Sequence, residues 1–374
     1  MLYNKLDYIT DKDGFISMVI YNTHPQDGIF ISPKYFPHPD GIWRSRIDGT
    51  KYQRFEYYWN LKQKSATRKQ KRVYDVDTNP LHDYSTDITA GFDKHLRYDP
   101  CYGVSMYLLP EDSIITYHDA RARYRQVVMD KPQEFKQFMP ILDNIINSFK
   151  LEDVGITGSY LYGIYQDFSD LNVVFYGSRP IKNFYNLLRE NNALEQEKII
   201  PLELTLPEWE GWINQKYIQE HLTQTEIDFE DRFIGSIHDP SDPNIRVGFW
   251  LADHQDVLDY GTFKKRSKGK ILIKADLEGW EEGMASGHFI LTNVEILGLD
   301  AINMEGIIHE KNLNLQIVGE FNRMFLFDEE VIIFGLLQEV EIIEKGGGEG
   351  VTIQYELLVG SREIGGWVAP VSFL

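Results

Sequence analysis

The sequence predicts an α+β protein made of several domains, and three observations support this prediction. The chain has 374 residues, which is longer than a domain with a single hydrophobic core usually is. Its middle part places apolar residues three and four positions apart, as helices do. Its last part is rich in β-branched and aromatic residues that are separated by turns. We therefore expect three domains, over residues 1–112, 113–265 and 266–374.

The first domain, residues 1–112, is predicted to be a small α/β unit. Short β-like runs such as GFISMVIYN, GIFISPKYF and GVSMYLLP are separated by the turn clusters HPQDG and PHPDG. These runs are long enough for strands, and the turns between them are short. We expect the strands to pair with one another in one sheet.

A strongly basic segment interrupts an otherwise acidic chain, which has 38 Lys and Arg residues, 57 Asp and Glu residues and a formal net charge of −19. Because phosphate binding depends on a local excess of cations, any nucleic-acid site must be local. Between residues 44 and 72 only Asp48 and Glu56 oppose the cations, and aromatic residues are interleaved. This mixture is typical of single-stranded nucleic-acid binding, and it also fits a solvated loop whose aromatic residues belong to the core. The candidate contact residues are Lys62, Lys64, Arg68, Lys69, Lys71 and Arg72.

Residues 120–149 are predicted to form two helices. In ARARYRQVVMDKPQEFKQFMPILDNIINSF the apolar residues recur at helical spacing, and Pro132 suits a helix start. Arg121, Arg123 and Arg125 spread over more than one face of such a helix, so we expect surface salt bridges, with a phosphate contact as the alternative. After residue 150 strand and helix patterns alternate, which indicates an α/β layer.

The stretch GITGSYLYGIYQDFSDLNVVFYG carries the candidate chemistry. Gly158 and Ser159 would form a tight turn between a buried strand and a helix, where free backbone N–H groups favour a phosphate. Residues two apart on a strand share a face, so Asp170 and Asn172 would both point towards that turn. A phosphate cradle beside acidic groups that hold magnesium is the arrangement that nucleoside triphosphate transfer needs.

These residues resemble the signature of the DNA-polymerase-β-like nucleotidyltransferase superfamily, a Gly-Ser turn followed after a short helix by Asp-hydrophobic-Asp. Gly158 and Ser159 match the turn, Asp170 matches the first aspartate, and Asn172 stands at the second. The opening LDYITDKDGFISMVIYNTHPQDGIFISPKYFP, the segment SDLNVVFYG and the β-rich tail are similar to the archaeal-type family of predicted nucleotidyltransferases.

The resemblance implies an α+β fold with a nucleotidyltransferase-like α/β core in residues 113–265. It implies transfer of a nucleoside monophosphate from an NTP to a hydroxyl, with Mg²⁺ as the cofactor. Asp170 and Asn172 would be the catalytic residues and metal ligands. Gly158 and Ser159 would bind the nucleotide.

Two of the three acidic positions that the resemblance implies lack a carboxylate. Asn172 offers a neutral oxygen, although a unit charge about 4 Å from a divalent ion contributes several kcal/mol even at an effective dielectric of about 20. The third acid is expected from the strand IRVGFWLA, which presents Gly248. Glu203 or Asp253 could supply the missing third carboxylate, but the match supports neither residue in particular. The sequence therefore leaves three functions open: a weakened nucleotidyltransferase, an inactive nucleotide- or nucleic-acid-binding pseudoenzyme, and a structural assembly protein.

Five β-rich runs in the last part predict a small closed barrel. They are KGKILIKADLE, HFILTNVEILG, EVIIFGLLQEVEII, VTIQYELLVGS and GWVAPVSF. An OB-like β-barrel is one such solution, and barrels of this type often bind nucleic acid. A second basic cluster leads into these runs and is interpreted as a polyanion contact or a linker. It comprises Lys264, Lys265, Arg266, Lys268 and Lys270.

Composition also predicts the surroundings of the protein. The single cysteine, Cys101, cannot form an internal disulfide, and the N-terminus lacks the basic and apolar regions of a secretory signal. We expect a cytoplasmic protein. No apolar run reaches the ~18 residues of a membrane-spanning helix, so no membrane partner is expected. The ten histidines form no close pair suited to zinc.

Overall fold

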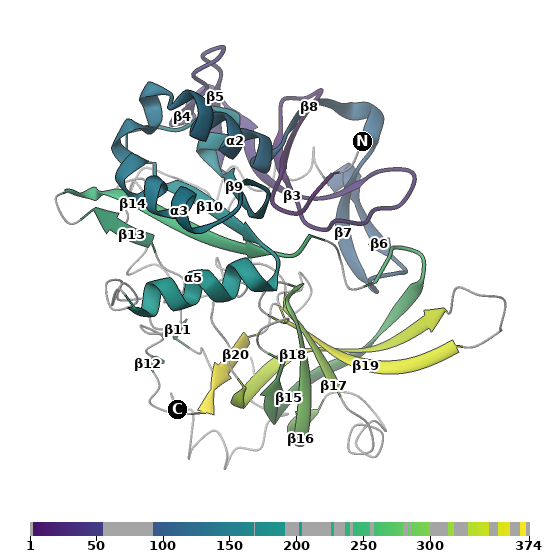
Figure 1. Cartoon of the computed structure of the whole chain (residues 1–374). Helices are drawn as coiled ribbons and strands as arrows, with labels where there is room; N and C mark the ends of the chain where they lie inside the picture. The colour runs from purple at the N-terminus through teal and green to yellow at the C-terminus, as the bar shows by residue number, and fades with distance from the viewer. Residues whose placement is uncertain are drawn as a thin grey trace.

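The computed structural model of the chain has an α+β fold with several sheets and few helices (Figure 1). This confirms the predicted fold class at its coarsest level. Among the described residues no helix is long and apolar enough to cross a membrane. The structure describes residues 3–54, 93–167, 169–190, 202–203, 226–227, 236–239, 242–254, 258–279, 283, 286–299, 313–317, 328–343, 351–359 and 367–371.

The first sheet has eight strands, and its pairings are antiparallel. Its path runs β4-β5-β3-β2-β1-β8, and the β6–β7 hairpin joins it through β3. β8 pairs with β1 although it lies beyond residue 112. The strands are β1 (Tyr8–Asp11), β2 (Ile16–Val19), β3 (Ile29–Pro37), β4 (Trp43–Arg44), β5 (Lys51–Arg54), β6 (Leu96–Asp99), β7 (Val104–Leu109) and β8 (Ile114–His118).

Local turn chemistry explains the β1–β2 hairpin of this sheet. The Asp11 carboxylate accepts hydrogen bonds from the backbone N–H groups of Asp13 and Phe15 at 3.0 and 2.9 Å, and Gly14 takes a φ of +81°. Within the described part of residues 1–112 the elements are strands and short 3₁₀ helices. The helical half of the predicted α/β unit is not found among those residues.

Two helices follow the first sheet, as the spacing of the apolar residues predicts. α2 (Ala120–Asp130) begins after Asp119, whose side chain accepts a hydrogen bond from a backbone N–H of the first turn at 2.8 Å. It ends at Lys131, which has a φ of 42°. A 3₁₀ turn then leads into α3 (Met139–Ser148). Apolar side chains of both helices belong to the main hydrophobic core.

The central sheet has four strands in the order β13-β14-β10-β9. β10 and β14 run parallel, and the other pairs are antiparallel. Because β10 lies inside the sheet, nearly all of its side chains are buried, which explains its apolar sequence LNVVFY. The strands are β9 (Val154–Thr157), β10 (Leu171–Tyr176), β13 (Ser236–Asp239) and β14 (Asp242–Ala252).

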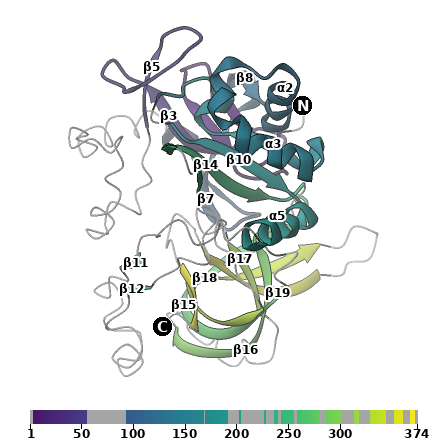
Figure 2. The ribbon, with the colours of Figure 1, turned by 60° about the vertical axis from the view of Figure 1, so that its left-hand side comes forward.

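Two helices and a small second sheet accompany the central sheet. α4 (Ser159–Tyr162) follows β9, and α5 (Ser178–Glu190) follows β10. Two views of the molecule place α5 between the central sheet and the C-terminal strands (Figures 1 and 2). β11 (Leu202–Glu203) and β12 (Glu226–Ile227) pair in a separate two-stranded sheet.

The C-terminal strands form a sheet whose pairing closes into a ring. β15 pairs with β16, β16 with β17, β17 with β19 and β19 with β18, and β18 pairs back to β15. The β17–β19 pair is parallel, and β20 pairs with β18 in addition. The strands are β15 (Phe263–Glu278), β16 (His288–Leu299), β17 (Leu313–Ile317), β18 (Glu329–Ile343), β19 (Val351–Val359) and β20 (Trp367–Pro370).

Two details of this ring differ from the sequence prediction. The run GWVAPVSF supplies β20, which is not a member of the ring, whereas the fifth ring strand is β17, which the sequence analysis does not identify. β15 begins at Phe263, so the basic cluster from Lys264 to Lys270 lies within a strand and is not a linker.

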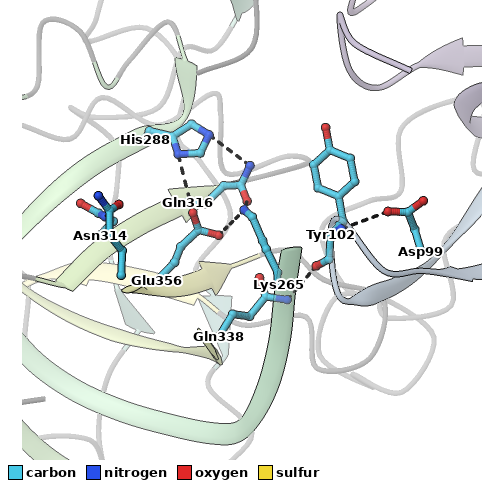
Figure 3. Close-up of polar contacts among 9 residues, drawn as sticks. Asp99, Tyr102, Lys265, His288, Asn314, Gln316, Gln338 and Glu356 are labelled. Carbon is cyan, nitrogen blue, oxygen red and sulfur yellow. Dashed lines mark hydrogen bonds and ion pairs between the residues drawn. The ribbon is translucent and has the colours of Figure 1, made fainter. Parts of the chain in front are cut away.

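The first sheet packs directly against the ring. Gly103 has a φ of +66°, and a Cβ atom there would come 2.4 Å from the Lys265 backbone oxygen. The Lys265 backbone N–H donates to the Cys101 carbonyl at 2.9 Å, and the Gln338 amide donates to the Tyr102 carbonyl at 2.9 Å (Figure 3). Aromatic and aliphatic side chains from both sides, such as Phe30 of the first sheet and Phe263 of the ring, share one buried cluster.

Candidate functional site

The Gly-Ser turn lies between β9 and α4, where the sequence predicts it. Gly158 has a φ of 68° and a ψ of −156°, a backbone conformation that other residues rarely adopt. A Cβ atom at this position would lie 3.0 Å from Asn172 Nδ2, so the turn packs on the acidic motif. Ser159 is buried, and α4 has only four residues. Because so short a helix sums few peptide dipoles, a phosphate bound here must be held by individual N–H groups.

The acidic motif lies at the start of β10. Asp170 comes just before the strand and Asn172 lies within it, yet the two side chains meet as predicted. Asn172 Nδ2 donates a hydrogen bond to Asp170 Oδ1 at 3.4 Å, and Trp250 Nε1 donates to Asn172 Oδ1 at 3.1 Å. These two contacts orient the Asn172 amide, with its oxygen towards the indole and its nitrogen towards the carboxylate.

The position at which the resemblance expects a third acid also lies at this point, and it is occupied by glycine. β14 runs parallel to β10 with Gly248 directly opposite Asn172. A Cβ atom built at Gly248 would lie 3.6 Å from Asp170 Oδ2 and 2.9 Å from Asn172 Oδ1. The amide oxygen of Asn172 therefore takes up space that a side chain at position 248 would need. Asn172 and Gly248 fit each other as a pair.

The side chains present do not fit a two-metal magnesium site. Asp170 is the one carboxylate at the three positions, and the single side-chain oxygen of Asn172 already accepts the indole hydrogen bond. Glu203 belongs to the separate two-stranded sheet, and Asp253 follows β14 about 16 Å along the strand from Gly248, at ~3.3 Å per residue. Within the described ranges no group of three or more His, Cys, Asp or Glu side chains is placed to hold a metal ion.

Replacing Gly248 with alanine is expected to lower the free energy of unfolding by about 1–3 kcal/mol. The added methyl group would meet Asn172 Oδ1 at 2.9 Å, so the amide must turn away and lose its hydrogen bond with Trp250. Urea denaturation of the wild type and the variant measures the loss. In an Asn172→Ala background the same substitution should cost little. An equal cost in both backgrounds would show that the amide does not occupy this space.

The start of the basic segment packs beside the loop that joins the turn to the acidic motif. The Arg46 backbone N–H donates to the Gly163 carbonyl at 2.8 Å, and Arg46 Nε donates to the Tyr165 carbonyl at 3.2 Å. Gln166 Nε2 donates to the Arg44 carbonyl at 2.9 Å. The Arg46 guanidinium thus lies beside this loop, where it also pairs with the Asp167 carboxylate at 3.5 Å, whereas Arg44 Nε donates to the Gly49 carbonyl at 3.3 Å. The predicted nucleic-acid contacts, which fall outside the described residues, are Lys62, Lys64, Arg68, Lys69, Lys71 and Arg72.

Trp250 is the site residue that sequence reasoning misses. It lies two positions after Gly248 on β14, and strand periodicity places the two on one face. A tryptophan on the face of the third acidic position is the pattern that could have revealed it. The sequence analysis expects salt bridges for the three arginines on α2. Arg123 forms one, with Glu134 at 3.3 Å. Arg121 instead stacks on Tyr176, with its guanidinium carbon 3.7 Å from the ring centroid.

The chain matches no family model, no curated protein and no solved structure. Four features meet around a common point. They are a turn that begins with glycine, one carboxylate, one oriented amide and a second glycine.

Proposed function

We propose that this chain is a nucleotidyltransferase-like protein that binds a nucleotide without performing metal-dependent nucleotide transfer. The supporting observation is the meeting of Asp170, Asn172 and Gly248 at adjacent positions of two parallel strands, with one carboxylate among them. The resemblance described above expects a carboxylate at each of the three positions. The three positions lie together, as the resemblance expects. Two of them, however, lack the carboxylate that it expects.

The chemistry of phosphoryl transfer supports the inactive interpretation. Two metal ions need several carboxylates to hold them and to offset the charge that develops on the attacking and leaving oxygens. Here a neutral amide stands at the second position, and its oxygen fills part of the third. A bound nucleotide would meet Asp170 as an uncompensated negative charge. Donors would come from the backbone of the Gly158 turn.

An active nucleotidyltransferase is the second candidate, favoured by the retention of Gly158, Ser159 and Asp170 in one place. It would transfer a nucleoside monophosphate from an NTP to a hydroxyl. A Mg²⁺-dependent reaction would then require a carboxylate from outside the described residues.

Single-stranded nucleic acid is the proposed further ligand, and two features support it. Arg44 and Arg46 lie beside the motif loop and begin the basic segment. The C-terminal ring returns from its fourth strand to its first, and its third and fifth strands are parallel. This order agrees with the five-stranded Greek-key barrel of an OB-like fold, a common nucleic-acid-binding scaffold.

The direction in which ATP affinity changes when the Asp170 charge is removed tests the proposed function. Asp170→Asn is expected to tighten binding of ATP in the presence of EDTA by about tenfold, because it removes a negative charge beside the phosphates. Magnesium should change the affinity of the wild type little. Isothermal titration calorimetry, with and without magnesium, measures both effects.

Asp167→Asn is the matched control, because Asp167 lies in the same loop, its side chain is fully exposed, and its ion pair with Arg46 at 3.5 Å is also open to solvent and therefore weak. It should leave ATP affinity nearly unchanged, since exposed charges are screened by solvent. If magnesium strongly tightens ATP binding and Asp170→Asn abolishes that gain, a metal site exists and the active enzyme is the correct alternative. If ATP does not bind at all, the nucleotide-binding proposal fails.

A further inference from the structure

Three planar side chains form a stack beside the Gly-Ser turn. Tyr160 directly follows Ser159 in α4, and its ring lies nearly parallel to that of Tyr165, with the centroids 4.3 Å apart and an interplanar angle of 5°. The guanidinium carbon of Arg46 lies over the Tyr165 ring, 5.2 Å from its centroid. Because Tyr160 already occupies one face of that ring, the guanidinium covers the other. The stack therefore runs from the residue next to the turn out to Arg46.

The inner end of the stack is fixed by the hydrophobic core and lies near the acidic motif. Tyr160 is buried, and the ring centroids of Phe135 and Phe138 each lie 5.3 Å from that of Tyr160. Burial raises the pKa of Tyr160, the Asp170 carboxylate raises it further, and the Arg46 guanidinium lowers it. Both charged groups are thus close enough to act on the same ring. This places the stack beside the proposed nucleotide site.

The outer end of the stack is held by the loop that leads to the acidic motif. The Arg46 backbone N–H donates to the Gly163 carbonyl at 2.8 Å, and Arg46 Nε donates to the Tyr165 carbonyl at 3.2 Å. An arginine that is held at its backbone and at its side chain has less conformational freedom to lose when a ligand binds. The guanidinium is therefore preorganised over the ring.

The outermost layer of the stack is open to solvent. The Arg46 side chain is 49% exposed, and its ion pair with Asp167 at 3.5 Å is open to solvent and weak. Because one face of the guanidinium lies over Tyr165, the exposed surface includes the opposite face. That face is planar, cationic and weakly hydrated, which suits an aromatic ring. Proteins stack unpaired nucleobases on guanidinium planes of this kind.

Ile47 adds an apolar side chain next to this face. It is 81% exposed, yet its turn is ordered, because Ser45 Oγ accepts hydrogen bonds from the backbone N–H groups of Ile47 and Asp48 at 3.2 and 3.3 Å. Ile47 Cδ1 lies 3.5 Å from where a Cβ atom at Gly163 would be, so the side chain reaches the same loop. It would bury apolar area against a ring stacked on Arg46.

We propose that Arg46 is the platform on which the base of a bound nucleotide stacks, while the phosphates of that nucleotide lie at the Gly158 turn. This inference rests on the proposed function and extends it, because it requires a ligand with a base and not a bare polyphosphate. Every base has a flat face, so the platform accepts all four bases and favours the larger purines.

Calorimetry in EDTA with ATP, UTP and tripolyphosphate tests the base contact. ATP is expected to bind at least about tenfold more tightly than tripolyphosphate, which carries the phosphates without a base. UTP should lie between the two, because its ring is smaller. Equal affinities for ATP and tripolyphosphate would overturn the proposal.

Two lysine variants assign the contact to Arg46. Arg46→Lys keeps the charge but loses the plane, so it should weaken ATP binding about tenfold and change tripolyphosphate binding less than about twofold. Arg44→Lys is the matched control, because Arg44 Nε also donates to a backbone carbonyl, that of Gly49 at 3.3 Å. Within the described residues its guanidinium lies over no aromatic ring, so both affinities should stay unchanged. An Arg46→Lys variant that binds ATP as the wild type does, or that loses both ligands equally, would contradict a base contact. The melting temperature verifies that each variant is folded.

Adenosine separates this proposal from the proposed function, because it carries a base without phosphates. Saturation-transfer NMR should detect contact with its ring protons in the wild type and a much weaker contact in Arg46→Lys. If adenosine makes this contact and tripolyphosphate does not bind, the base platform is correct and the phosphate site at the Gly158 turn is wrong. If tripolyphosphate binds and adenosine makes no contact that depends on Arg46, the base platform is wrong. If neither probe binds, both proposals fail.

Discussion

Replacing Lys265 with methionine is expected to lower the free energy of unfolding by about 3–5 kcal/mol. Methionine keeps most of the length of the apolar stem but leaves the Glu356 carboxylate without its partner at 2.5 Å. That carboxylate is 6% exposed, so water cannot easily replace the ammonium. Burying one unpaired charge costs much more than burying a neutralised pair. Urea denaturation followed by circular dichroism measures the loss.

Two further variants separate the loss of the pair from the loss of a charge. Adding Glu356→Leu to Lys265→Met should recover most of the stability, because an apolar pair replaces the ion pair. Arg266→Gln removes a cation from the next position on β15, whose side chain is 57% exposed beside Glu341. It should cost at most about 1 kcal/mol. If Lys265→Met costs no more than Arg266→Gln, the pair is not effectively buried.

The basic cluster around Lys265 shows where sequence patterns fail. A run of like charges predicts a solvated linker or a polyanion contact, but β15 runs through it and alternates its faces. Lys264 and Arg266 are exposed, and Lys265 is buried. The neutralising partner, Glu356, lies 91 positions further along the chain. A pair so distant in sequence leaves no local pattern from which its burial could be predicted.

The local elements of the fold could be predicted much better than their pairing. α2 and α3 follow from apolar spacing, because a helix satisfies its backbone within itself. The strands of the ring were predicted from composition with one exception, β17, which is only five residues long and pairs in parallel with β19. Parallel pairing joins segments far apart in sequence, so neither its existence nor its register can be predicted from local composition.

At the candidate site, too, the local features could be predicted better than the strand pairing. The motif predicts that Gly158, Asp170 and Asn172 lie together, because one turn and one strand connect them. The position of Gly248 follows from the parallel pairing of β14 with β10, which the resemblance suggests and composition alone does not. The Trp250 hydrogen bond depends on that register as well. It could not be derived before the two strands were placed side by side.

The wild-type protein is expected to transfer no more labelled nucleotide to protein, RNA or small hydroxyl acceptors than the Asp170→Ala variant does. This expectation follows from the proposed function, because one carboxylate cannot hold two metal ions. Incorporation of labelled NTP, measured for both proteins in parallel, tests it directly. Robust wild-type transfer that Asp170→Ala abolishes would contradict the proposal and point to a carboxylate outside the described residues.

The pattern of rescue follows from the geometry and gives the sharpest test of the proposed site. Asn172→Asp places an oxygen where an N–H now lies 3.4 Å from Asp170 Oδ1, so two carboxylates would repel each other until a cation binds between them. Magnesium should therefore raise the melting temperature of this variant and not that of the wild type. Adding Gly248→Asp should strengthen magnesium binding further, because its Cβ atom would lie 3.6 Å from Asp170 Oδ2, once the side chain at position 172 has turned away from the 2.9 Å contact that its oxygen would otherwise make with that atom. The double variant should show the first measurable transfer, whereas Asn172→Asp alone should show little. If magnesium stabilises neither variant, the three positions do not form a latent metal site, and the nucleotidyltransferase-like interpretation of this chain is wrong.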